Sequence, residues 1–293
     1  MNQKAELFVD SRCELGEGPF WHTGLNRLFW FDILNQTLLS ADASGRVIDR
    51  FTFRQPVTAA AVIDDDHLAI ASAGALLRFT VSTDTYSEIV PIEADNPGNR
   101  TNDSRVHPSG GFWIGTMSRR GDEEPHAGAV YLYRDGALET LFDRITIPNS
   151  ICFSPDGSIA YFADTPSGMI RQCAVDPASG RITGEWRDFA STKGHRGMPD
   201  GAVVDAEGYL WSARWGGSCV VRHAPDGSVD RVIEVPTSHV TCPAFGGEDM
   251  KTLYITTARE HMEPEQLAEE PHAGSVFQIR VDVPGTPEPR LAL

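Results

Sequence analysis

One pattern of hydrophobic and polar positions recurs six times along the chain. In each copy, a turn rich in Gly, Pro, Asn or Asp precedes a short hydrophobic strand, which is usually built around an aromatic side chain. The strands are centred on Trp30, Ile70, Trp113, Tyr161, Trp211 and Tyr254. Their spacing of roughly 40 to 50 residues is typical of propeller blades. We therefore predict an all-β fold, a six-bladed β-propeller.

The repeats run from end to end, so we expect residues 1–293 to form a single domain. The segment 261–270 (HMEPEQLAEE) is a candidate for one short helix. The N-terminal segment 5–10 (AELFVD) is expected to complete the last sheet, because closing the ring removes unpaired strand edges. The Pro-rich tail, residues 281–293, is expected to be loosely ordered up to its final apolar residues.

The repeat also predicts where polar side chains meet. Strands that repeat around an axis bring the starts of their innermost members to one mouth. Counting back about a dozen residues from each strand centre leads to one position in each repeat. The six positions are Glu17, Thr58, Asn102, Asn149, Asp200 and Cys242. We expect them to ring a single funnel.

Three of these positions carry oxygen ligands suited to a metal ion. Glu17, Asn149 and Asp200 would supply two carboxylates and an amide oxygen from three different blades. Such a hard, oxygen-only set is typical of a divalent cation site, and three protein ligands leave room for water or substrate. The alternative is that these residues only form turns, since Asn, Asp and Gly are common in loops of any function.

Charge and composition exclude several classes of partner. The chain has 41 acidic and 25 basic residues and a formal charge of −16, so most of its surface would repel nucleic acids and anionic lipids. We expect neither a nucleic acid nor a membrane partner. The N-terminus lacks the apolar region of a signal peptide, and the five cysteines lack CxxC spacing, so we expect buried thiols in a cytoplasmic protein.

Five blocks of sequence resemble the regucalcin and gluconolactonase family of sugar lactonases. The blocks are LGEGPFW, NRTNDSRVHPSGGFWIGTM, IPNSICFSPDG, MPDGAVVDAEGYLW and CPAFGGEDMKTLYITTA. They occur in the family's order and span nearly the whole chain. The resemblance implies a six-bladed propeller with one divalent cation in its central channel. It also implies that Glu17, Asn149 and Asp200 hold this cation, the same three residues that the repeat indicates.

The resemblance assigns further roles. It implies that Arg100 and Asn102 bind the hydroxyls and ring oxygens of the substrate, with Asp103 beside them. It makes Asp200 the general base, although Asp200 could instead serve only as a metal ligand. Animal members of the family have acidic residues after the GTM motif, whereas this chain continues as SRRGDEEP. Arg119 or Arg120 thus occupies the place of a substrate-binding carboxylate, unless Glu123 or Glu124 takes over.

The expected function is metal-dependent hydrolysis of a sugar lactone. The substrate would be an aldonolactone such as glucono-, xylono- or arabinonolactone, and the product the open-chain aldonate. Calcium, zinc, manganese, magnesium and ferrous iron all suit an all-oxygen site. The alternatives are a non-catalytic propeller that binds a cation or ligand, and a related propeller esterase or phosphotriesterase. No GxSxG motif supports a serine nucleophile. The sequence predicts no oligomeric state.

Overall fold

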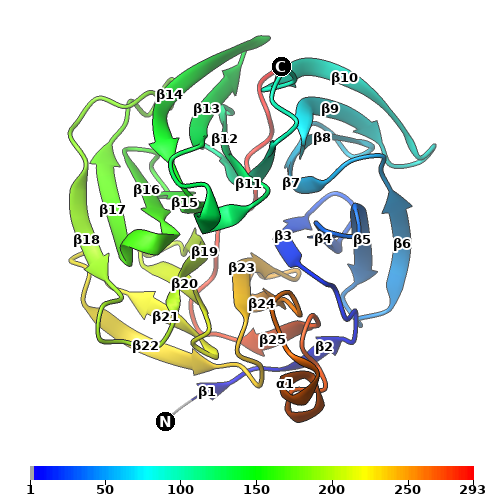
Figure 1. Ribbon diagram of the computed structural model, residues 1–293, viewed down its shortest axis with the longest axis vertical. Helices are drawn as coiled ribbons and strands as arrows, with labels where there is room; N and C mark the ends of the chain where they lie inside the picture. The colour runs from blue at the N-terminus through cyan, green and yellow to red at the C-terminus, as the bar shows by residue number, and fades with distance from the viewer. Residues whose placement is uncertain (1–2) are drawn as a thin grey trace.

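Each repeat folds as a four-stranded antiparallel meander, because its short hydrophobic runs are separated by tight turns. The computed structural model describes residues 3–293, in which six sheets surround a central axis (Figure 1). Five have four strands, and the sixth gains a fifth strand from the N-terminal segment. The six-bladed β-propeller predicted from the repeat is confirmed. We number the blades 1 to 6 in the order of their innermost strands.

The strands fall into four concentric sets. The innermost strands are β3 (Gly16–His22), β7 (Val57–Val62), β11 (Asn99–Val106), β15 (Pro148–Phe153), β19 (Met198–Val204) and β23 (Val240–Gly246). The second strands are β4 (Arg27–Asp32), β8 (His67–Ser72), β12 (Phe112–Ser118), β16 (Ile159–Asp164), β20 (Leu210–Trp215) and β24 (Thr252–Thr257). The third strands are β5 (Thr37–Asp42), β9 (Gly74–Thr80), β13 (Gly128–Arg134), β17 (Met169–Ala174), β21 (Cys219–His223) and β25 (Val276–Arg280). The outermost strands are β6 (Val47–Thr52), β10 (Thr85–Ile92), β14 (Ala137–Ile145), β18 (Arg187–Ser191), β22 (Val229–Glu234) and β2 (Glu6–Val9).

The core lies between the faces of neighbouring blades. The hydrophobic residue at the centre of each repeat sits on the second strand, and all six are at most 2% exposed. The Trp21 ring of blade 1 stacks on Tyr254 of blade 6, with ring centroids 5.6 Å apart. Such pairs bury large apolar areas and hold adjacent sheets together. The five cysteines are free and buried, as predicted.

The N-terminal segment closes the ring. Strand β2 pairs antiparallel with β25 and so completes blade 6, as predicted. Before it, β1 (Gln3–Lys4) pairs in parallel with β22 at the edge of blade 5 (Figure 1). Helix α1 (Pro264–Glu269) forms within the expected segment, and reciprocal capping bonds of Glu263 and Gln266 fix its start. No helix in residues 3–293 has the length and apolarity needed to cross a membrane.

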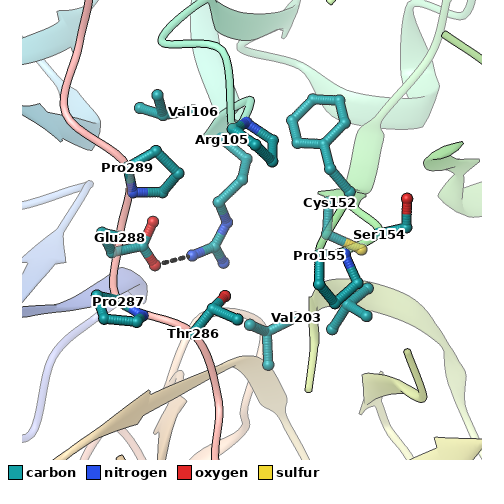
Figure 2. Close-up of a pocket in the computed structure, with 13 residues that line it drawn as sticks. Arg105, Val106, Cys152, Ser154, Pro155, Val203, Thr286, Pro287, Glu288 and Pro289 are labelled. Carbon is teal, nitrogen blue, oxygen red and sulfur yellow. Dashed lines mark hydrogen bonds and ion pairs between the residues drawn. The ribbon is translucent and has the colours of Figure 1, made fainter. Parts of the chain in front are cut away.

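The prediction of a loosely ordered C-terminal tail is wrong. Beyond β25 the chain crosses the far ends of the innermost strands, opposite the mouth, and backbone hydrogen bonds fix it to several blades. The amides of Leu291 and Ala292 donate to the carbonyls of Val62 and Gly110, at 2.8 and 2.9 Å. Figure 2 shows Glu288 of the tail paired with Arg105 of β11. The tail's order comes from contacts remote in sequence, which its Pro-rich composition does not reveal.

Candidate active site

All six innermost strands carry an irregularity at the same height. Their pairing with the second strand shifts register between Glu17 and Phe20, Val57 and Ala59, Thr101 and Ser104, Asn149 and Cys152, Pro199 and Ala202, and Val240 and Pro243. An irregularity of this kind redirects side chains away from the ladder. Each of the six ring positions predicted from the sequence lies at or within one of these shifts.

Four of these six side chains meet in a cavity at the mouth, the end of the channel where the innermost strands begin. Its volume is about 430 Å³. Six of the residues proposed for the site line it: Glu17, Arg100, Asn102, Arg119, Asn149 and Asp200. Asp103 does not line it, and neither do Thr58 and Cys242. The structure thus gathers residues from blades 1, 3, 4 and 5 in one cavity.

A chain of hydrogen bonds joins the polar groups of blades 3 and 4. Nη1 of Arg100 donates to Oδ1 of Asn102 at 2.7 Å. Nδ2 of Asn102 in turn donates to Oδ1 of Asn149 at 3.2 Å and to the carbonyl of Pro148 at 2.9 Å. Asn102 therefore orients both Arg100 and Asn149 as well as lining the cavity.

Thr165 determines the orientation of the Asn149 amide. The Thr165 hydroxyl donates to the carbonyl of Pro199 at 2.9 Å, and its oxygen accepts from Nδ2 of Asn149 at 2.8 Å. With Nδ2 engaged in this way, the group that Asn149 can offer a cation is its Oδ1, which retains a free lone pair. The sequence analysis did not identify Thr165.

Two carboxylates lie buried beside this amide. Glu17 is 8% exposed and Asp200 is 6% exposed. Burial is the main cause that raises the pKa of both groups. The charge of Asp103 raises the pKa of Glu17 further, and the charges of Glu17 and Asp103 raise that of Asp200. A divalent cation would offset this repulsion, and two carboxylates with an amide oxygen form a hard donor set that fits one. Within residues 3–293, no group of three or more His, Cys, Asp or Glu side chains is placed to hold a metal ion.

Asp103 lies farther along the channel. Its Oδ2 accepts a hydrogen bond from the amide of Ile151 at 2.7 Å. Burial raises its pKa to about 6, although the positive charge of Arg105 opposes that rise. Asp103 therefore acts on the cavity through its charge, between Glu17 at the mouth and Arg105 at the far end, rather than by lining it.

The loop after β12 contributes charges of both signs. It includes a short 3₁₀ turn, η1 (Gly121–Glu123), and Arg119, Arg120 and Glu123 all line the cavity. Arg120 pairs with Glu123 at 3.4 Å, and both side chains are largely exposed. Glu124 instead accepts a hydrogen bond from the hydroxyl of Ser118. Of the two acidic residues considered from the sequence, Glu123 is the one at the mouth.

The lining residues missed by the sequence analysis include Thr165, Glu260 and His261. Thr165 directly follows the second strand β16. Glu260 and His261 lie three and four residues after the end of the second strand β24. Because second strands run antiparallel to the innermost strands, they end where the innermost strands begin. The residues that follow a second strand therefore reach the mouth, and this rule could have identified them.

Comparison with known proteins gives the family. Residues 15–259 match the family model described as the SMP-30/gluconolactonase/LRE-like region. The chain belongs to this family. It is 38% identical to a putative sugar lactone lactonase of Rhizobium meliloti (strain 1021), over 97% of this chain and 96% of the relative. It is also 38% identical to the L-arabinolactonase of Azospirillum brasilense, over 99% of this chain and 96% of the relative.

A solved structure of the same family matches the fold closely. It is the crystal structure of a calcium-binding protein, regucalcin, from Agrobacterium tumefaciens strain C58. The TM-score is 0.96 at 38% sequence identity, and the match covers 100% of this chain and 99% of that one. This member of the SMP-30/gluconolactonase/LRE-like family is thus related over almost its full length to proteins named as sugar lactonases and as a calcium-binding protein.

Proposed function

We propose that this protein hydrolyses a sugar lactone, opening an aldonolactone to its aldonate with the help of one divalent cation. The observation that carries the proposal is the grouping of Glu17, Asn149 and Asp200 in one mouth cavity. Relatives named as lactonases over nearly the full chain support it. The similar regucalcin structure, described as that of a calcium-binding protein, supports the choice of a divalent cation.

In this proposal Glu17, Asn149 and Asp200 hold the cation. When bound, the ion would polarise the lactone carbonyl and offset the negative charge that develops on its oxygen. Hydrogen bonds hold two of these side chains in position before the cation binds. Thr165 accepts from the Asn149 amide, and the Gly18 amide donates to Oε2 of Glu17 at 2.8 Å. A preoriented site of this kind loses little free energy to reorganisation on binding.

Arg100 is proposed to bind the substrate. It is 9% exposed, and among the described residues only its Nη1 forms hydrogen bonds, to Thr101 and Asn102. Its other N–H groups remain for the hydroxyl or ring oxygens of a sugar, which a planar guanidinium suits. Asn102 supports this role by holding Arg100 in place. Arg119 lies at the outer part of the same cavity and would contact the far end of the substrate.

Asp200 is proposed to move the proton. Its carboxylate takes a proton from the attacking water as the new C–O bond forms, and returns it to the ring oxygen as the lactone C–O bond breaks. Burial and the nearby Glu17 favour a protonated Asp200, whereas a bound cation favours the ionised form that accepts a proton. The competing role for Asp200, as a ligand only, makes a different prediction for Asp200→Asn, which is given below.

A lactonase assay on a panel of aldonolactones tests the proposal. Proton release is followed by a pH indicator, with and without a chelator, and is compared with the spontaneous rate. We expect hydrolysis of at least one lactone, loss of that activity with chelator and recovery with a divalent cation. Glu17→Ala should abolish it, whereas Glu265→Gln, an exposed position on helix α1, should not.

Three outcomes would contradict the proposal. Saturable cation binding without turnover of any lactone would favour a non-catalytic binder. Faster hydrolysis of a phosphotriester or a simple ester than of every sugar lactone would favour the esterase class. Full activity of Glu17→Ala in the presence of chelator would remove the metal from the mechanism.

A further inference from the structure

A buried arginine side chain without an anionic partner lies away from the mouth. Arg214, near the end of β20, is only 2% exposed. Its Nε and Nη1 are buried and have no hydrogen-bond partner among residues 3–293. It forms no ion pair with any residue that the structure describes. A buried charge without a partner is strongly unfavourable, because the lost hydration is not replaced.

The hydrogen bond that Arg214 does make is to a neutral group. Its Nη2 donates to Nε2 of His223 at 2.7 Å, and Nδ1 of His223 donates to the carbonyl of Gly227 at 3.0 Å. The imidazole that accepts at Nε2 and donates at Nδ1 is uncharged. Burial and the adjacent guanidinium accordingly lower the pKa of His223 to about 4. His223 therefore adds no negative charge.

Two other buried or mostly buried arginines outside the mouth have carboxylate partners. Arg222, in the same blade and 3% exposed, contacts Asp205, Glu207 and Asp230 within 3.0 Å. Arg105 has Glu288 (Figure 2). Arg214 departs from this pattern, because no carboxylate side chain pairs with its guanidinium.

Arg214 lines a cavity of about 500 Å³ between blades 4 and 5. The end of β18 and the loop that follows it form one wall, and strands β20, β21 and β22 form the other. At its rim, Arg196 contacts both carboxylate oxygens of Glu234 at 3.1 Å, so this acid is already paired. His195 also lines the cavity, which shares no residue with the mouth cavity.

We propose that this interblade cavity is a binding site for a small oxyanion, with Arg214 as its charged donor. The ligand is a phosphate, sulfate or carboxylate group, which accepts several N–H bonds from one guanidinium. His195 and Ser191 lie on the facing wall and supply polar contacts from the other side. The valines at 221, 229 and 232 line the remainder, so a short apolar body attached to the anion fits beside them.

Calorimetric titration of the full-length, metal-free protein tests this site. The probes are inorganic phosphate, sulfate and acetate at constant ionic strength, and the one that binds most tightly identifies the headgroup. We expect saturable binding with one anion per chain. Arg214→Met should weaken it by roughly tenfold or more, as expected for loss of a charge-assisted hydrogen bond. Arg119→Met, which removes an arginine from the mouth, should leave it unchanged.

A second variant keeps the test decisive if Arg214→Met does not fold. Val232→Glu places a carboxylate in the same cavity and should abolish anion binding while raising the melting temperature measured without anion. The proposal is wrong if the native protein shows no saturable binding of any probe. It is also wrong if Arg119→Met removes the binding and Arg214→Met retains it, because the anion then binds at the mouth.

Discussion

At the scale of single residues, the proposed cation site depends on which end of one amide faces the cavity. Asn149 can present either an oxygen or an NH₂ group, and only the oxygen can bind a cation. Thr165 favours the outward oxygen by accepting from Nδ2 of Asn149 while it donates to Pro199, and this adds to the bond from Nδ2 of Asn102 to Oδ1 of Asn149. A residue with no charge and no direct role in the chemistry thus controls a ligand.

Replacing Thr165 tests this control. Thr165→Val removes the acceptor, so the Asn149 amide can turn its NH₂ group toward the cavity. We expect cation affinity to fall by about 10 to 100-fold, the range found for residues that orient metal ligands. Thr165→Ser keeps the hydroxyl and should retain affinity close to that of the native protein. Calorimetric titration with calcium measures both, and equal affinities for the Val and Ser variants would refute the role.

Asp200→Asn separates the two roles considered for Asp200. If Asp200 moves the proton, the variant should still bind the cation through its amide oxygen but lose about 10² to 10⁴-fold in kcat. Cation titration and lactone hydrolysis on the same sample measure the two effects. Loss of cation binding together with activity would leave Asp200 as a ligand only.

Residues at one phase of the repeat could be predicted individually, whereas loop residues after a second strand could be assigned to the mouth only as a group. Glu17, Asn149 and Asp200 lie at equivalent points of three blades, so counting along the repeat finds them. Glu260 lies in a loop whose length and path vary between blades, and its neighbours in sequence carry no periodic signal. Its place at the mouth depends on how the loop after β24 folds back.

At the scale of elements, the C-terminal tail shows the limit of reasoning from composition. Proline-rich segments have little periodicity, and the tail forms no regular strand. Its order comes from backbone bonds to blades that are distant in sequence and from the ion pair of Glu288 with Arg105. The blades themselves were predictable, because each carries its own alternating pattern and turns. The tail lacks such local signals.

Breaking the pair between Glu288 and Arg105 should destabilise the protein. Glu288→Ala leaves a mostly buried guanidinium without its carboxylate, which costs roughly 3 kcal/mol of unfolding free energy, the lower end for a broken buried pair. Asp282→Ala removes an exposed acid of the same tail, whose pair with Arg231 should contribute less than about 1 kcal/mol. Urea denaturation measures the free energy of unfolding of both variants. Equal losses would show that the pair of Glu288 with Arg105 contributes no more to stability than the exposed pair.

At the scale of the whole molecule, the carboxylates at the mouth link stability to pH. Because burial raises the pKa of Glu17 above its ordinary 4.5, the folded protein keeps a proton that the unfolded chain has released. The free energy of unfolding of the metal-free protein should therefore fall as the pH rises above 4.5. The fall is about 1.4 kcal/mol for each pH unit over which the folded protein holds one more proton than the unfolded chain. A bound cation stabilises the ionised form and should reverse the trend.

Thermal melts of the chelated protein at pH 5 and pH 8 measure this effect. Glu17→Gln replaces the titrating carboxyl with an amide that does not titrate. The melting temperature of this variant should therefore change less between the two pH values than that of the native protein. Saturating calcium should raise the native melting temperature more at pH 8 than at pH 5. Identical pH profiles for the native and Glu17→Gln proteins would show that Glu17 is not the group responsible.

The pairing of β2 with β25 has a consequence for biosynthesis. The strand that seals the ring leaves the ribosome before the other strands of its blade, and its partner, Val276–Arg280, emerges only after the other five blades. Until then the nascent chain carries a strand without its partner, open to pairing with other polypeptides. Premature termination before residue 276 would leave that strand without its native partner, so truncated products should aggregate rather than accumulate as shorter propellers.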